Sequence, residues 1–334
     1  EGRALLAADD NRLAKLIDKE VFSQVVVAPP FASCSVAFCL VSAPEGLAML
    51  KADDNRLAKL IDKEVVNQVI LEGSLAGYSV AFCLATTSEG RALLAADDNR
   101  LAKLIDKEVL NQVVLGGPLV GYSVALCLAY VTEGQALLAI DENRLAKLID
   151  KEVLNQVILA DPVVGYSVAF CLASTSEGQA MLVADDNRLA KLIDKEVLNQ
   201  VILVGSLAGY SVALCLANTP EGLALLAVDD NRLAKLIDKE VLNQVVLGGP
   251  FADSSVARCL ANTPEGRAML VADDNQLLNL IDKETRDHVV AGGLCEDQSV
   301  ASQKRRTRPK RQHSGRAAGE ATAEVVTTQE RRSK

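Results

Sequence analysis

The sequence predicts an all-α protein built as an α-solenoid of about seven stacked helical units. The pair Glu-Gly returns every 44 residues without insertion or deletion, and it starts units at Glu1, Glu45, Glu89, Glu133, Glu177, Glu221 and Glu265. A fixed period of this size is the signature of stacked repeats. Hydrophobic residues make up 49% of the chain, but aromatic residues only 3%, and Trp is absent. The core therefore consists of Leu, Val, Ile and Ala, which suits closely packed helices.

Glycine and proline divide each unit at two zones, and helices are predicted between them. The first helix, as in Ser123 to Ala129, begins with Ser as its N-cap and is apolar nearly all round, so it belongs inside. The second is announced by Thr219-Pro220-Glu221, which places a capping hydroxyl, a proline at the first helical position and an acid in the first turn.

A third helix is predicted from the acidic pair Asp97-Asp98 through Leu101, Leu104 and Ile105, which share one face. The pair is interpreted as an N-terminal cap, because it lacks the spacing of a calcium loop. The apolar residues that follow do not lie on this same helical face. We therefore expect a break near residues 106–108, and then a short helix or an extended piece that ends at the Gly/Pro turn.

Charge separates the chain into two predicted parts, a repeat body at 1–303 and a tail at 304–334. The tail carries 10 Lys/Arg against 3 Glu, while the body carries 25 Lys/Arg against 41 Asp/Glu. The tail lacks periodicity, so we expect it to be disordered. Its basic cluster is the group Lys304, Arg305, Arg306, Arg308, Lys310 and Arg311. The cluster allows nucleic-acid binding by the tail, or a nuclear-targeting signal on a secreted effector.

Six of the eight cysteines share one unit position inside the apolar first helix: Cys39, Cys83, Cys127, Cys171, Cys215 and Cys259. Helices that pack ~8–10 Å apart are too distant for a disulfide. A metal site needs converging ligands, and each unit offers one Cys and no His. We expect buried free thiols, no metal, no cofactor and a reducing intracellular compartment. With only two His in the chain, we also expect no enzymatic activity.

The sequence also allows two alternatives to a protein-binding scaffold, namely a membrane protein and a nucleic-acid-binding protein. Residues 109–132 carry no charge, but Gly116-Gly117-Pro118 interrupts them and the equivalent segments contain charges, so a buried helix and a turn are favoured over a membrane span. A ridge of Arg100, Lys103 and Lys107 permits nucleic-acid binding by the body. Interleaved acids and the overall acidic charge instead favour a solvated face.

The unit resembles a stretched ankyrin repeat, through Gly121-Tyr-Ser123, Ala129, Glu133-Gly134 with Ala136-Leu137-Leu138, and Asn111. Val124 and Leu126 stand where that family has Pro and His. The 44-residue period also allows a HEAT or armadillo-type unit. Either resemblance implies a helical solenoid that binds proteins.

The seventh copy loses its apolar pattern, with Thr285, Arg286 and Asp287 in the third region, which is typical of a terminal cap. The chain begins inside a unit without Met, which indicates a fragment.

Copies differ mainly in the turn, beside it, and around Glu-Gly, so these positions are predicted to line a partner surface. The candidate residues are Tyr78, Tyr122, Tyr166, Tyr210, Glu72, Asp161, Arg91, Gln135 and Gln179. We expect a monomer that binds a protein partner along this surface.

Overall fold

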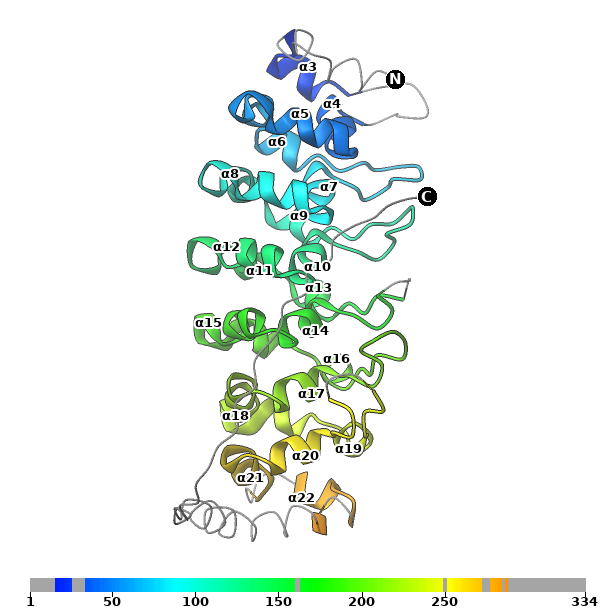
Figure 1. Cartoon of the computed structure of the whole chain (residues 1–334), viewed down its shortest axis with the longest axis vertical. Coiled ribbons are helices and arrows are strands. Elements are labelled where there is room, and N and C mark those ends of the chain that lie inside the picture. The colour runs from blue at the N-terminus through cyan, green and yellow to red at the C-terminus, as the bar shows by residue number, and fades with distance from the viewer. Residues whose placement is uncertain are drawn as a thin grey trace, which may run out of the picture. The chain divides into compact units, whose positions relative to one another are not determined.

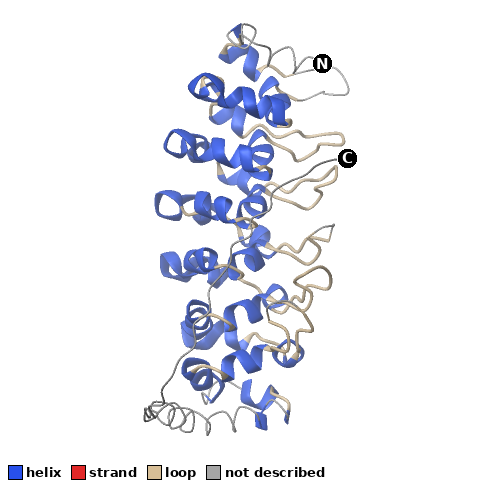
Figure 2. Ribbon diagram, in the orientation of Figure 1, coloured by secondary structure: helices blue, strands red, loops and turns tan. Residues whose placement is uncertain are grey.

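The computed structural model describes residues 16–25, 34–159, 163–248, 251–271, 277–283 and 286–287. These residues form helices and contain no β-strand, only isolated bridges such as Val69 with Ser79 (Figure 2). The prediction of an all-α protein is confirmed. By internal contacts the chain divides into Glu1–Val290, which holds every described helix, and Ala291–Lys334. The predicted tail and most of the seventh copy's end lie outside the described residues.

The first helix of each unit forms as the sequence predicts. Ser123 is its N-cap in the central copy, where the hydroxyl oxygen accepts a hydrogen bond from the Leu126 amide at 3.1 Å. All six residues of this helix are buried. The equivalent helices are α4 (Val36–Val41), α7 (Val80–Thr86), α10 (Val124–Ala129), α14 (Val168–Ala173), α17 (Val212–Ala217) and α20 (Val256–Ala261).

The second helix also begins where predicted. Thr219 caps α18, its hydroxyl accepts from the Gly222 amide at 3.0 Å, and Pro220 occupies the first turn. Glycine is needed at the second unit position because a β-carbon on Gly134 would overlap the carbonyl oxygen of Leu128 in α10. The second helices are α5 (Pro44–Asn55), α8 (Ser88–Leu104), α11 (Thr132–Leu138), α15 (Ser176–Leu192), α18 (Pro220–Lys235) and α21 (Pro264–Val271).

The acidic pair does not cap a third helix, and that interpretation was wrong. Asp97, Asp98 and Asn99 have φ values of 50°, 57° and 59°, so they form a left-handed turn between two right-handed halves of α8. The short polar chains of Asp and Asn tolerate this conformation better than other residues with a β-carbon. The turn kinks α8, and α12 (Ile140–Leu148) contains the same left-handed turn at Asp141, Glu142 and Asn143. The segments equivalent to the second half of α8 include the 3₁₀ helix η1 (Ala58–Leu60) and α22 (Leu277–Leu280).

The expected break near residue 106 is confirmed, and a short helix follows it. Ile105 is extended, and Asp106 caps α9 by accepting from the Val109 amide at 3.1 Å. Val109 and Leu110 are buried, which explains the shift of the apolar pattern. The short helices are α3 (Lys19–Ser23), α6 (Lys63–Val66), α9 (Lys107–Asn111), α13 (Lys151–Asn155), α16 (Lys195–Leu198) and α19 (Lys239–Asn243).

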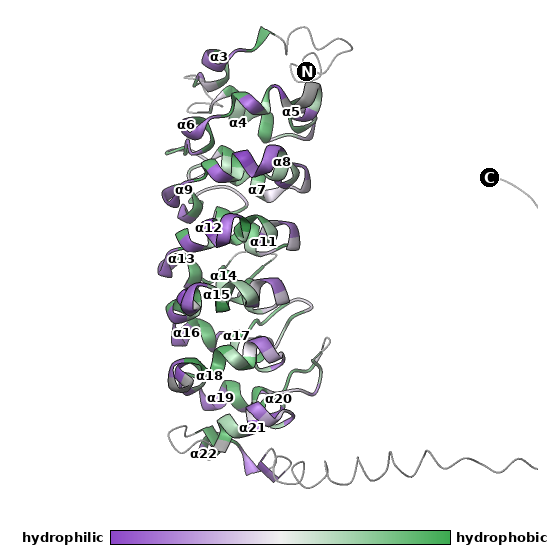
Figure 3. Ribbon diagram, turned by 90° about the vertical axis from the view of Figure 1, so that its left-hand side faces the viewer, coloured by the Kyte–Doolittle hydropathy of each residue, from purple (hydrophilic) through white to green (hydrophobic). Residues whose placement is uncertain are grey.

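Equivalent helices of consecutive copies pack against each other. Helix α10 contacts both α7 and α14, and α17 contacts both α14 and α20. Figure 1 shows the copies following one another in layers from α4 to α20. In Figure 3 the short helices α9, α13 and α16 succeed one another along one edge, with a strongly hydrophilic segment in each. The buried residues of all described copies form one hydrophobic cluster.

An asparagine at the end of five of these short helices, α6, α9, α13, α16 and α19, bonds to the next copy. The Asn111 amide nitrogen donates to the Leu148 carbonyl at 2.8 Å, and its oxygen accepts from the Asp150 amide at 2.9 Å. These two backbone groups flank the break before α13, where the helix leaves them without intrahelical partners. The same pair of bonds is made by Asn67, Asn155, Asn199 and Asn243.

The arginine of each predicted basic ridge bonds to the preceding copy. Arg100 donates through Nη2 to the carbonyls of Ala58 at 2.9 Å and Ile61 at 3.0 Å. Lysines bridge copies as well, and Lys107 lies 2.7 Å from the Asp150 carboxylate. Much of the predicted ridge is thus engaged between copies.

In the seventh copy, the carbonyls at the equivalent unit positions accept hydrogen bonds from an arginine of the same copy. Arg286 donates to the carbonyls of Leu278 and Ile281, both at 3.1 Å. These carbonyls occupy the unit positions of Ala58 and Ile61, which accept from the following copy's Arg100 elsewhere. This contact supports the interpretation of the last copy as a cap.

Candidate functional site

A hairpin-like loop follows short helices such as α9, and strongly exposed leucines lie on the described parts of these loops. In the hairpin after α9, the Val114 amide donates to Tyr122 O at 2.8 Å and the Gly121 amide donates to Val114 O at 2.9 Å. Gly121 has a φ of 88°, which a residue with a side chain rarely adopts. The loops project on the side of the layers opposite α8 and α12 (Figure 1).

Five leucines at one unit position lie exposed on these hairpins. Their exposed fractions run from 70% for Leu115 to 93% for Leu247. We call this group the leucine row, and its members are Leu71, Leu115, Leu159, Leu203 and Leu247. In each case the preceding residue is buried, as Val114 is beside Leu115, so the extended arm alternates between core and solvent. The sequence alone does not distinguish this row from the core, because leucines recur at buried unit positions as well.

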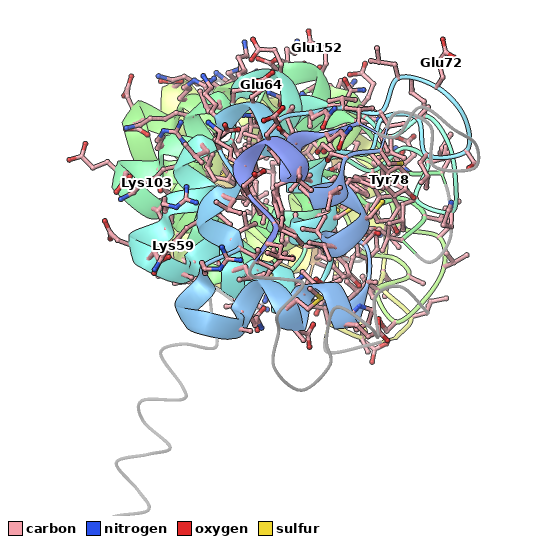
Figure 4. All side chains as sticks on the ribbon, turned by 90° about the horizontal axis from the view of Figure 1, so that it is seen from above. Lys59, Glu64, Glu72, Tyr78, Lys103 and Glu152 are labelled. Atoms are coloured by element: carbon pink, nitrogen blue, oxygen red, sulfur yellow. The ribbon has the colours of Figure 1, made fainter. Side chains whose placement is uncertain are left out.

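Exposed glutamates lie in the first turn of the short helices just before the hairpins. They form a glutamate row of Glu64, Glu108, Glu152, Glu196 and Glu240. None of the ion pairs between described residues includes these carboxylates. Figure 4 places Glu64, Glu152 and the hairpin residue Glu72 along the same side of the layers. The apolar row is therefore accompanied by negative charge.

A hollow of about 270 Å³ opens between the end of α7, α8, α10 and the hairpins that precede α10 and α14, and we call it the tyrosine pocket. Tyr122, Tyr130 and Tyr166 line it together with Arg91 and apolar residues such as Leu119. The rings of Tyr130 and Tyr166 lie 5.9 Å apart at an angle of 49°. Burial raises the pKa of Tyr122 to about 12 and also raises the pKa of Tyr166, so both hydroxyls stay protonated at neutral pH.

Arg91 enters this pocket from α8. Its Nη1 donates to the Ala85 carbonyl at 3.0 Å, while its Nε is buried without a hydrogen-bond partner among the described residues. Of the predicted partner residues, the structure therefore brings together Tyr122, Tyr166 and Arg91. It adds Tyr130, which is not among the residues predicted from the sequence.

Four other predicted residues are buried, and their assignment to a partner surface was wrong. Tyr78 and Tyr210 are only 7% and 3% exposed, and the Tyr210 hydroxyl accepts from the Phe251 amide at 3.2 Å. Figure 4 shows Tyr78 among packed side chains and Glu72 at the outer end of its hairpin. Glu72 is exposed as expected, and Asp161 lies outside the described residues.

Gln135 and Gln179 are each 1% exposed and join neighbouring helices. The Gln135 amide donates to the Ala129 carbonyl at 2.7 Å and accepts from the hydroxyl of Thr175, the cap of α15, at 2.7 Å. Variation between copies at this position changes a buried hydrogen bond instead of a surface contact. The basic cluster Lys304, Arg305, Arg306, Arg308, Lys310 and Arg311 lies outside the described residues.

The cysteine column is buried as predicted in five of its six positions, and Cys39 is half-buried. Burial raises the pKa of the Cys127 thiol to about 12. Where the structure describes the chain, no three His, Cys, Asp or Glu side chains gather as a metal site would require.

Over the same described ranges, every helix is too short or too polar to cross a lipid bilayer. The segment 109–132, weighed as a membrane span, instead forms the end of α9, its hairpin and α10.

Comparison with known proteins gave no match to any family model, curated protein or solved structure. Functional inference accordingly rests on the chemistry of these surfaces.

Proposed function

We propose that this chain is a non-catalytic α-solenoid scaffold that binds another protein along its hairpin side. The leucine row is the observation that carries the proposal. Soluble proteins rarely expose apolar residues as an aligned, repeated set unless the set is an interaction site. Burying one leucine side chain stabilises a complex by roughly 1.5–3 kcal/mol, so several together supply substantial affinity.

The repeat is, in this proposal, ankyrin-like. Each central copy joins helices to a hairpin, as ankyrin units combine helices with a β-turn, while HEAT and armadillo units contain helices alone. The 44-residue unit accommodates the extra short helix that ends in the bridging asparagine.

The partner we propose is an amphipathic helix with an apolar residue at every seventh position. Packed helices lie ~8–10 Å apart, so equivalent leucines of consecutive copies are spaced by about that distance. A helix rises about 10.5 Å over seven residues, which matches this spacing. Each apolar side chain of the partner then meets one leucine of the row.

The charge of the surface selects a basic partner helix. The glutamate row lies on the short helices that lead into the hairpins of the leucine row, and residues 1–303 carry 25 Lys/Arg against 41 Asp/Glu. Lys or Arg on the flanks of the apolar stripe therefore increases the association rate, and this contribution weakens as salt screens the exposed charges.

The test uses a synthetic helical peptide with Leu at every seventh position and Lys on both flanks of that stripe. Isothermal titration of the full chain with this peptide should give saturable binding. The triple variant Leu115→Ser, Leu159→Ser and Leu203→Ser should raise Kd at least ~tenfold, because ~1.4 kcal/mol already changes affinity by that factor. The three side chains are exposed, so helical circular dichroism should stay unchanged.

Two matched peptides and one matched variant complete the experiment. Replacing Lys by Glu in the peptide should abolish binding at low salt, and moving Leu to every fifth position should weaken it. Exchanging the exposed Leu16, which lies outside the leucine row, for Ser should leave Kd unchanged. Equal Kd values for the original chain and the triple variant would overturn the proposal, as would equal binding of all three peptides.

A further inference from the structure

The tyrosine pocket departs from the repeat in a way that folding does not require. Tyr130 stands at a unit position occupied by Thr86, Ser174 and Asn218 in other copies. Those copies stack equally well with small polar residues there. Tyr130 is nevertheless 53% exposed, and its ring adds an apolar wall against Tyr166. A feature found in one copy and not needed for stacking points to a ligand.

Arg91 gives the pocket an unused hydrogen-bond donor and a positive charge. In the next copy the equivalent Gln135 has its amide fully occupied by Ala129 and Thr175. The Arg91 Nε–H, in contrast, is buried with no partner in the described structure. The Nε atom is closed to solvent, so a ligand oxygen is received by the other N–H groups of the guanidinium, which lines the pocket.

The acidic residue nearest to Arg91 in the sequence does not accept a hydrogen bond from the Arg91 Nε–H. Glu89 is exposed, and its carboxylate accepts from the Ser88 hydroxyl at 2.9 Å. The pocket walls consist mostly of Tyr, Leu, Val and Ala side chains, so a carboxylate brought in by a ligand meets Arg91 in a partly dry environment. Charge-assisted hydrogen bonds of this kind are stronger than those between neutral groups.

Two opposing effects determine whether the pocket favours an anionic or a cationic ligand. A cluster of tyrosine rings alone favours a cation over the ring faces. Arg91 is itself a permanent cation in the same pocket and repels a second positive charge. The guanidinium carries only N–H donors, so its ligand must supply an acceptor, which an ammonium group does not provide.

We propose that the tyrosine pocket binds a ligand with an aliphatic body and a terminal carboxylate. The body lies against the wall formed by Tyr130 and Tyr166, and the carboxylate accepts from Arg91. This site is distinct from the leucine row, so it does not depend on the protein-binding function proposed above.

Three simple probes distinguish this ligand class: hexanoate, hexylamine and hexanol. The chain has no Trp and five Tyr, three of which line the pocket, so tyrosine fluorescence reports occupancy directly. Hexanoate should bind the full chain at least ~tenfold more tightly than hexanol, which is the effect of one good charged hydrogen bond. Hexylamine should bind most weakly.

Arg91→Gln installs the residue that the next two copies carry as Gln135 and Gln179, so the variant is expected to fold. It should bring hexanoate and hexanol to equal affinity. Tyr130→Ser, which copies Ser174, should weaken both probes in parallel. Arg267→Gln is the matched control, because it makes the same change at the same unit position outside the pocket. It should preserve the preference for hexanoate, and so should the leucine-row triple variant.

Three results would overturn the proposal. The first is a fluorescence response equal for hexanoate and hexylamine. The second is an Arg91→Gln chain that keeps the preference for hexanoate. The third is the absence of any saturable response to hexanoate while circular dichroism shows the chain folded.

Discussion

At the scale of the residue, a single asparagine per copy joins two layers. An amide side chain carries both donors and an acceptor, so Asn111 satisfies the carbonyl of Leu148 and the amide of Asp150 together. Alanine at this position leaves both backbone groups unpaired. We expect Asn111→Ala to lower the free energy of unfolding by about 2–3 kcal/mol in urea titrations.

The control for this variant is Asn262→Ala, at an exposed residue after α20. It should change stability by less than ~0.5 kcal/mol, as surface substitutions usually do. Equal losses in the two variants would mean that the amide of Asn111 contributes nothing across the layers.

Neighbouring residues of one apolar stripe differ in burial, and stability should follow that difference. The sequence places Leu101, Leu104 and Ile105 on one face, but the structure buries Ile105 completely and Leu104 only in part. Ile105→Ala should therefore cost about 2–5 kcal/mol, and Leu104→Ala about 1 kcal/mol. Urea titrations of the two variants measure this directly, and the reverse order would refute the register described for the second half of α8.

At the scale of the element, local signals were predictable and longer-range ones were not. Ser123 and Thr219 cap helices through contacts with residues three positions away, so sequence patterns sufficed. Gln135 was misplaced because variation between copies was interpreted as exposure, whereas it bonds to Thr175 forty residues away. The leucine row was missed because a leucine just before a turn has the same sequence signature whether it faces core or solvent.

The left-handed turn within the second helix contains a residue whose replacement should increase stability. Glu142 has a φ of 57°, where most copies have Asp. The left-handed conformation costs a residue with a β-carbon roughly 1–2 kcal/mol, and it costs glycine almost nothing. Glu142→Gly should therefore raise the free energy of unfolding by about 1 kcal/mol.

A matched glycine elsewhere should act in the opposite direction. Glu108→Gly, within the right-handed helix α9, should lower stability by about 1 kcal/mol. Urea titrations of both variants give the two signs. Destabilisation by Glu142→Gly would contradict the left-handed geometry of the turn.

At the scale of the whole molecule, the series of repeats must end in a copy that has no following copy to bond with. Arg286 replaces the usual leucine of the short helix and donates to carbonyls that a following copy would otherwise bond. Arg286→Leu restores the repeat and exposes an apolar end. We expect this variant to self-associate in sedimentation velocity, whereas Arg286→Lys, which keeps the charge, should stay in the same state as the original chain.

Coupling between layers should determine how individual copies open. Alkylation requires a thiolate, and burial raises the pKa of Cys127 to about 12 and that of Cys259 to about 11, so folded thiols react slowly and labelling reports local opening. Cys127 and Cys259 are 8% and 7% exposed, so their native accessibility is matched. Cys127 lies in α10, which packs between α7 and α14, whereas Cys259 lies in α20, near the capped end. Cys259 should therefore be alkylated faster by iodoacetamide in sub-denaturing urea, as peptide mass spectrometry can measure. In strong denaturant the two should react at equal rates. Equal rates in sub-denaturing urea as well would indicate copies that open independently, and the stacked scaffold would then be the wrong description of this chain.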